Sequence, residues 1–271
     1  MLRLWVPVGS TWYDSLQVTV NKRYSHGREL QGSYTRAKQL SVGAEGDVSF
    51  FQAVSPQVND FTNRNQNKYL SGYDQPNLLV FSGSYTTQKW FGNKVLSYFV
   101  RDWNIGGVFR YGSGFPIRVP NSNNALASVL NRGTFANRIA GQPLFLQDLN
   151  CHCFDPSRTL VLNPAAWTDP AAVQFSSSTA YYNDYRYQRR PSENMSFSRL
   201  LRIKDKMSLN VLAELTNVFN RTKPANPSGL NFTANPAKDA QGRYSSGFGQ
   251  INYAVPFSAA RTGQLVARFQ F

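Results

Sequence analysis

The residues best suited to chemistry are two cysteines that flank a histidine, Cys151-His152-Cys153. Thiolates and an imidazole are good zinc ligands, so this tripeptide is a weak candidate for a metal site. A structural zinc site needs a fourth ligand and usually a wider spacing, and the only other histidine is His26. The alternative is a loop pair that is either idle or oxidised to a disulfide, which would be strained between cysteines so close in sequence. We favour this alternative and expect no metal and no cofactor.

The rest of the chain offers no arrangement that is typical of catalysis. It has no nucleophile elbow, no HExxH motif and no glycine-rich phosphate loop. With two histidines in the chain, acid–base chemistry would depend on aspartates and glutamates, which are scattered without a paired spacing. The sequence therefore predicts a protein that is not an enzyme.

The formal net charge of +14 is compatible with binding to nucleic acid or to another polyanion. The basic residues do not form long clusters, however, and the longest are pairs such as Lys22-Arg23 and Arg189-Arg190. Positive charge spread over loops and over the lining of a pore explains the same composition. We therefore expect no nucleic-acid partner.

The elements that must position these residues are strands, because apolar and polar residues alternate with a period of two. No apolar run approaches the roughly 20 residues of a transmembrane helix. The alternating segments are 15–24, 28–39, 77–88, 103–112, 194–203, 209–216 and 263–271. Long polar connectors, at 40–75, 120–190 and 221–260, alternate with shorter ones. This order is typical of an antiparallel up-and-down β-barrel with long loops at one rim.

Each predicted strand has one apolar and one polar face. In the first of them, Leu16 and Val18 alternate with Gln17 and Thr19. In a soluble barrel the apolar face points inward, whereas in a lipid-embedded barrel it points outward and the polar face lines the lumen. The candidates for residues that line the lumen are Arg23, Arg110, Arg202, Glu214 and Arg268. They would contact a plug or an acidic solute, or they would pair with one another in a water-filled lumen.

An aromatic and basic cluster ends the longest connector. Tyrosine and arginine together suit capture of a ligand. They suit equally well the anchoring of a barrel rim among lipid headgroups. The candidate residues for ligand contact are Tyr181, Tyr182, Tyr185, Arg186 and Tyr187, beside Arg189 and Arg190.

The last strand carries apolar residues at alternate positions up to the terminal phenylalanine: Leu265, Ala267, Phe269 and Phe271. This ending resembles the signal that the barrel-assembly machinery reads when it inserts outer-membrane barrels. Four further segments resemble the TonB-dependent receptors of the Oar-like branch, which carry a carboxypeptidase regulatory domain. They are YDSLQVTVNKRYSHG followed by SYTRAK, then DWNIGGVFRYGSGFPIRV, LNPAAWTDPA and AELTNVFNRT, and they come in the family's order over roughly residues 12–271.

The resemblance implies a 22-stranded barrel closed around a plug, which takes up a scarce solute with energy delivered by the TonB complex. Residues 1–271 would then be a C-terminal barrel segment of about seven or eight strands, without plug, regulatory domain or signal peptide. We expect turns 25–27, 89–102 and 204–206 in the periplasm and the three long connectors outside the cell, with the apolar face against outer-membrane lipid. By itself such a segment would be an open sheet with two unsatisfied edges.

Two other classes of protein remain open. The first is a small porin-like or structural outer-membrane barrel. The second is a soluble, basic β-sandwich that binds polyanions. The direction in which the apolar faces point separates the second class from the membrane proteins: a sandwich would bury Leu16, Phe109, Val211 and Phe269 together in one sealed interior.

Overall fold

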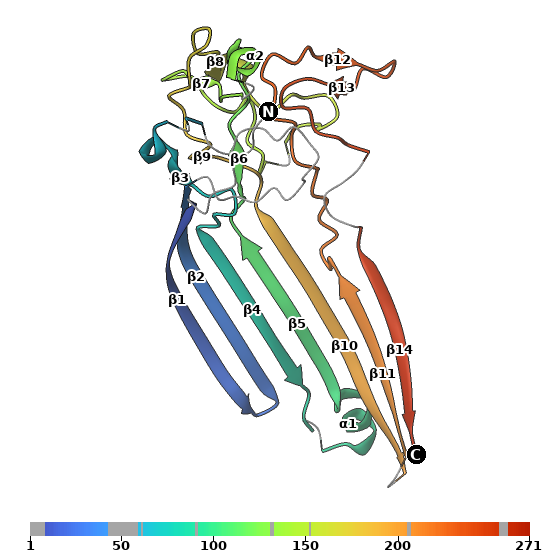
Figure 1. Cartoon of the computed structure of the whole chain (residues 1–271). Helices are drawn as coiled ribbons and strands as arrows, with labels where there is room; N and C mark the ends of the chain where they lie inside the picture. Colours follow the sequence, from blue (N-terminus) through green and yellow to red (C-terminus); the bar gives the residue numbers. More distant parts are fainter. Residues whose placement is uncertain are drawn as a thin grey trace.

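Seven long strands lie side by side in one antiparallel sheet, and a region of short elements and loops lies beyond one end of them (Figure 1). The computed structural model describes residues 9–42, 59–60, 62–89, 92–130, 133–151, 153–204, 207–254 and 260–271. The long strands are β1 (Ser10–Ser25), β2 (Arg28–Val42), β4 (Asn77–Thr86), β5 (Trp103–Gly112), β10 (Arg190–Lys204), β11 (Met207–Thr216) and β14 (Thr262–Gln270). The short strand β3 (Lys68–Leu70) pairs with the end of β2.

Each long strand pairs with the next long strand along the chain, in the order β1-β2-β4-β5-β10-β11-β14. This order confirms the predicted all-β, up-and-down architecture. The first hairpin is longer than expected, because pairing continues past Ser15 until Ser10 meets Val42. No cis peptide bond and no crossover interrupts the described sheet.

The turns at one end of the sheet are short, as the sequence predicts. Between β1 and β2, His26 and Gly27 both adopt positive φ angles, 51° and 75°. This is the left-handed backbone that tight hairpins need for the right-handed twist of their strands. A Cβ atom on Gly27 would lie 2.3 Å from the carbonyl oxygen of Thr86, so the position also excludes a side chain. Residues Asp205 and Lys206 of the last predicted turn lie outside the described residues.

The connector between β4 and β5 holds a short helix, α1 (Lys94–Val100), that the sequence analysis did not predict. The Asn93 side chain caps it by accepting a hydrogen bond from the backbone nitrogen of Val95, at 2.9 Å. The helix lies at the same end of the sheet as the short turns (Figure 1). None of the helices in the described part of the chain is long and apolar enough to cross a membrane.

The long connectors fold into a region of their own at the opposite end of the sheet (Figure 1). Its elements, besides β3, are η1 (Arg64–Asn67), β6 (Pro116–Arg118), α2 (Leu126–Leu130), β7 (Asn137–Arg138), η2 (Pro164–Ala166), β8 (Trp167–Thr168), β9 (Tyr181–Arg186), β12 (Ala237–Lys238) and β13 (Tyr244–Ser246). They pair as β6 with β9, β7 with β8 and β12 with β13. The connector at 120–190 is long, as the sequence predicts, but short elements and their pairing order it. We call the folded part that the long connectors form the loop region.

The hydrophobic core of the described chain lies in the loop region and not in the seven-stranded sheet. Its buried members are Tyr69, Ile117, Val119, Phe135, Ala136, Leu144, Val161, Leu162, Ala166, Trp167, Ala180, Tyr185, Phe248 and Ile251. They come from segments that lie far apart in the sequence. Burying these side chains contributes roughly 1.5–3 kcal/mol for each large one and offsets the entropy cost of ordering such long loops.

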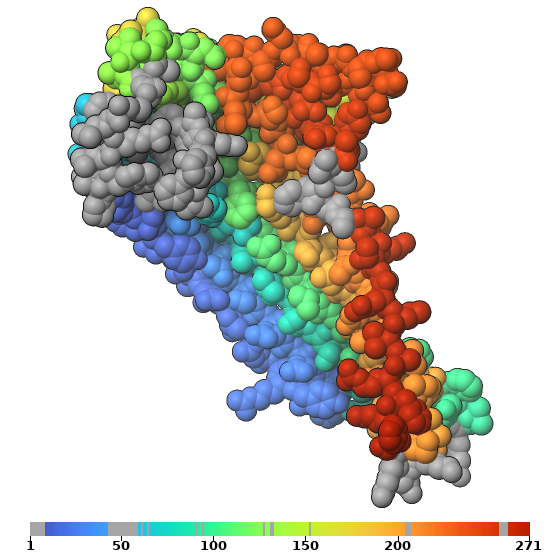
Figure 2. All heavy atoms as spheres, turned by 45° about the vertical axis from the view of Figure 1, so that its right-hand side comes forward, coloured from blue at the N-terminus to red at the C-terminus, as the bar shows by residue number. Residues whose placement is uncertain are grey.

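The sheet is a single layer with its apolar residues exposed. Leu16 is 63% exposed, Val211 37% and Phe269 46%, so these residues do not meet in a sealed interior. Figure 2 shows that, from this side, nothing packs over the strands along most of their length. This arrangement excludes the β-sandwich, in which two sheets bury their apolar faces against each other.

Candidate functional site

The pairing register places the apolar residues of neighbouring strands on one face of the sheet. Phe81 pairs with Phe109, with ring centroids 6.4 Å apart, and Ile105 pairs with Phe197. The same face carries Leu16, Val18, Val20, Leu30, Tyr34, Leu79, Tyr85, Trp103, Tyr111, Met195, Leu201, Leu209, Val211, Leu215, Leu265 and Phe269. The other face carries mainly hydroxyl, amide and charged groups, as at Ser82, Asn104, Ser196 and Glu214.

The structure places four of the five lumen-lining candidates on the polar face but does not bring them together. Arg110 lies near the loop end and donates a hydrogen bond to Gln75, at 3.3 Å. Arg202 lies near the turn end and forms an ion pair with Asp102, at 3.5 Å. Glu214 accepts a hydrogen bond from Gln264 of the neighbouring strand.

The remaining two candidates are also separate. Arg268 pairs with Asn210 across the β11–β14 ladder. Arg23 is exposed in β1, where the register shifts before the turn. Spread in this way, the five charges line a wall and do not form one binding site.

This geometry, a meander with one continuous apolar face, agrees with the comparison with known families. The profile described as outer membrane beta barrel domain matches residues 2–264. The chain belongs to this family. No curated protein and no solved structure matches the chain. As an outer-membrane barrel, the sheet crosses the outer membrane with its strands, its apolar face meets lipid and its polar face is turned to the lumen.

A pair of arginine substitutions on one strand of the outer-membrane barrel tests this assignment of the faces. Val211 lies mid-strand on the apolar face, and its neighbour Leu212 points to the opposite face. We expect Val211→Arg to destabilise the complete barrel by about 2–4 kcal/mol, because the charge enters hydrocarbon. Leu212→Arg should cost clearly less, because its charge reaches the lumen. Urea unfolding in lipid vesicles measures both, and a reversed order would contradict the assignment.

The apolar face of this barrel also carries charged residues, and the sequence analysis did not place the two that lie in β10 on this face. The first, Arg199, pairs with Trp103 and Val211. Its guanidinium lies 5.3 Å from the ring centroids of both Trp103 and Tyr98, and it donates a hydrogen bond to the Tyr98 carbonyl oxygen. Tyr98 of helix α1 therefore shields the Arg199 guanidinium at the end of the sheet where the short turns lie.

The second is Glu193, which pairs with Phe109 near the loop end of β10 and is only 1% exposed. Arg221 Nε donates to its two carboxylate oxygens at 2.9 and 3.0 Å, and the Tyr111 hydroxyl donates at 3.1 Å. Both charged residues occupy positions in phase with the apolar alternation. A charge at such a position is the sequence signal that could have revealed them.

The tyrosine cluster of the barrel does not form an exposed capture loop. Its first part, Tyr181–Arg186, forms β9, in which Tyr185 is fully buried and its ring centroid lies 5.4 Å from those of Phe145 and of Trp167. Burial raises the pKa of the Tyr185 hydroxyl far above its ordinary range. Tyr181, Tyr182 and Tyr187 are half-buried and pack against the same core. The expectation of ligand contact is therefore wrong for Tyr185, because no solute reaches its ring.

Arg186, at the end of β9, serves as a structural link. Its Nη2 atom lies 2.6 Å from the carboxylate of Asp74, which is 2% exposed, and its Nη1 atom donates to the carbonyl oxygens of Asp74 and Gly114 at 2.9 and 3.2 Å. The other Asp74 carboxylate oxygen accepts from the backbone nitrogen of Gln39, at 2.7 Å. The pair therefore joins the loop region to the end of β2.

Cys151 and Cys153 are joined in a disulfide, so neither is available as a thiolate ligand in this structure. His152 lies outside the described residues. Within the described ranges no group of three or more histidine, cysteine or acidic residues is arranged to hold a metal ion. The structure thus agrees with the oxidised loop pair and gives the metal site no support.

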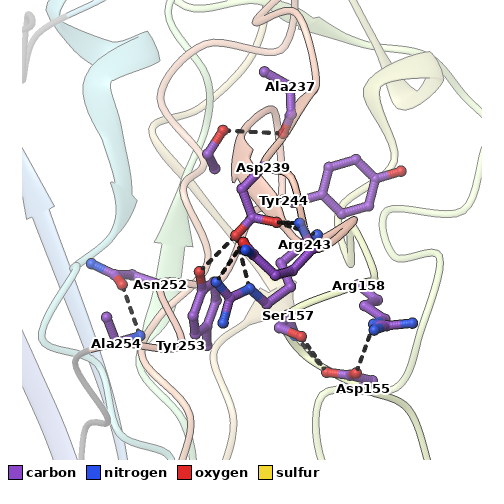
Figure 3. A network of polar contacts seen from close by, with 12 residues as sticks. Asp155, Ser157, Arg158, Ala237, Asp239, Arg243, Tyr244, Asn252, Tyr253 and Ala254 are labelled. Carbon is purple, nitrogen blue, oxygen red and sulfur yellow. Dashed lines mark hydrogen bonds and ion pairs between the residues drawn. The ribbon is translucent and has the colours of Figure 1, made fainter.

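Polar contacts tie the last loop of the barrel to the longest one, as Figure 3 shows. Asp239 accepts hydrogen bonds from Arg243 Nε at 2.8 Å and from the Tyr253 hydroxyl at 3.2 Å, and the backbone nitrogen of Tyr244 donates to the Ser157 carbonyl oxygen at 2.7 Å. The backbone amide of Arg243 lowers the pKa of the Asp239 carboxyl. The contribution of this carboxylate to stability is therefore present at neutral pH and is lost as the pH falls through the lowered pKa.

The terminal strand is one of the two edges of the described sheet. Leu265, Ala267 and Phe269 lie on the apolar face, and Phe271 follows the strand with its ring centroid 6.1 Å from that of Phe269. The first three of these side chains lie in a row on the apolar face, where we expect the barrel-assembly machinery to recognise the strand. That recognition stays a prediction.

Proposed function

We propose that this chain forms part of the wall of a TonB-dependent receptor of the Oar-like branch, which takes up a scarce solute and catalyses no reaction. The observation that carries the proposal is the pair of open edges. Within the described residues β1 and β14 pair on one side only and not with each other. An unpaired backbone group in hydrocarbon costs several kcal/mol. Seven strands in sequence order, with a polar face and open edges, therefore fit best as one arc of a larger barrel.

The folded loop region supports uptake of a specific solute over a general pore. Diffusion through a porin needs only an open lumen. Capture of one solute is favoured by an ordered surface, because less entropy is lost on binding. Here the outer connectors share one core, in which Ile117, Leu162, Tyr185 and Ile251 pack together. The proposed partners are outer-membrane lipid, the barrel-assembly machinery and, through a plug outside this chain, the TonB complex.

Ion conductance separates this proposal from a porin-like barrel. The product of the complete gene is reconstituted in planar bilayers. We expect no steady conductance, because a plug fills the lumen of a TonB-dependent receptor, and open channels once the plug is deleted. A purified TonB periplasmic domain should bind the intact protein and not the plug-deleted control. Steady open channels in the intact protein together with absence of TonB binding would rule the proposal out.

A further inference from the structure

Two hollows lie one beyond the other along β4 and β5 on the apolar face. The one near the loops has a volume of about 630 Å³. Its floor is formed by strand residues Tyr34, Leu79 and Tyr111, and loop residues Arg189, Arg221 and Lys223 surround its upper side. It therefore combines an apolar floor with a basic rim, at the level where the strands leave the bilayer.

Among the described residues, positive charge predominates around this upper hollow. Its three cations face one adjacent carboxylate, the buried Glu193, which Arg221 already pairs. Arg189 is exposed and forms no ion pair within the described ranges, and Lys223 donates to the carbonyl oxygen of Pro191. Burial lowers the pKa of Lys223, as do the charges of the neighbouring arginines, whereas Glu193 raises it. An anion in the hollow would relieve this concentration of positive charge.

The lower hollow, of about 400 Å³, continues the upper one toward the middle of the bilayer. On β4 the next residues on this face after Leu79 are Phe81 and Gly83, and on β5 those after Tyr111 are Phe109 and Gly107. Gly83 pairs with Gly107, and the side chains of Leu30 and Phe109 reach over these two glycines, while Ile105 and Met195 form part of the walls of the hollow. From Leu79 to Gly83 the strand rises about 13–14 Å, the length of an extended acyl segment of roughly ten carbons.

We infer that the two hollows together hold one phosphorylated lipid of the outer leaflet. Its phosphate would lie among Arg189, Arg221 and Lys223, because guanidinium and ammonium groups donate charge-assisted hydrogen bonds to phosphate oxygens. An acyl chain would lie in the lower hollow, against Phe81, Phe109 and Met195. The upper hollow has three cations at the membrane surface, whereas the lower hollow is lined mainly by apolar residues and has Arg28 at its turn end. This order matches the polarity of such a lipid, and a soluble anion would leave the lower hollow unused. The inference depends on the outer-membrane location and not on TonB coupling.

Native mass spectrometry of the complete protein in a neutral maltoside detergent tests this site. We expect one molecule of phosphatidic acid to stay bound, and neither phosphatidylcholine of the same chains nor inorganic phosphate to bind comparably. The double variant Arg189→Gln/Lys223→Gln should weaken phosphatidic acid binding at least about tenfold, since two charge-assisted hydrogen bonds are lost. Met195→Phe, which fills the lower hollow without changing charge, should also weaken it.

The matched control removes the same charge elsewhere. Arg158→Gln/Lys238→Gln takes two cations from the loop region, where Arg158 pairs with Asp155 and Lys238 lies over the ring of Tyr244. This control should bind phosphatidic acid like the parent protein. Equal losses in both double variants, unchanged binding by Met195→Phe, or equal retention of phosphatidylcholine would overturn the site and indicate nonspecific lipid. Binding of inorganic phosphate as tight as that of the lipid would indicate a soluble anion instead.

Discussion

Replacement of Tyr185 by alanine is expected to destabilise the loop region by about 3–5 kcal/mol, the usual range for removing a buried aromatic side chain. The ring is fully buried between Phe145 and Trp167, and β9 on both sides of it pairs only with the three residues of β6. The loops of the Tyr185→Ala variant on intact cells should therefore be digested by protease at least about a hundredfold faster than those of the parent protein. This holds when the cleavage rate is proportional to the fraction of molecules whose loop region is unfolded.

Tyr185→Phe is the matched control, because it removes only the hydroxyl group. That hydroxyl is buried and has no hydrogen-bond partner within the described residues. Its removal should leave stability unchanged or raise it by about 1 kcal/mol, because an unsatisfied buried donor is costly. If Tyr185→Phe opened the loops as much as Tyr185→Ala does, the hydroxyl would have an essential partner and the packing argument would be wrong.

Arg186→Ala should cost a similar 3–5 kcal/mol, for an electrostatic reason. Asp74 is 2% exposed, so loss of its guanidinium partner leaves a charge in a buried place. The double variant Asp74→Leu/Arg186→Met removes both charges and should recover part of the loss. Thermal unfolding of the loop region in the complete protein, followed by protease digestion at increasing temperature, compares the variants.

A second ion pair that also involves β9 provides the control for Arg186. Arg138 contacts both carboxylate oxygens of Asp184, at 3.1 and 2.6 Å, but the two side chains are 29% and 60% exposed. Arg138→Ala should cost about 0–1 kcal/mol, because water replaces much of this interaction. Equal effects of Arg138→Ala and Arg186→Ala would show that burial of Asp74 does not determine the energetics.

If both predictions hold, the loop region acts as one body that is fastened to the strands. The Asp74–Arg186 pair joins it to β2, and the Glu193–Arg221 pair joins the end of β10 to the start of the last loop. A solute would then meet a preformed surface and not a set of independent loops. Preformed surfaces bind with a smaller entropy cost than flexible ones.

Much of the sheet could be predicted from the sequence. Strand order, turn positions and the two faces follow from alternation of period two, which is local, and from tight turns such as His26-Gly27. The exceptions are specific. Helix α1, whose Tyr98 contacts Arg199, is short and carries only a weak sequence signal. Glu193 lies in phase with apolar residues, and nothing near it in the sequence indicates that its partner is the distant Arg221.

The chain's alternation by itself determined that an antiparallel meander forms and that one of its faces is apolar. Only the tertiary structure decided what the long connectors do. The core around Tyr185 draws Tyr69, Phe135, Leu162 and Ile251 from distant segments that have no common period. The alternation period and the turn residues indicate only how residues close in the sequence are arranged. This core depends on contacts between distant segments, which form only after the paired strands have brought the ends of the connectors together.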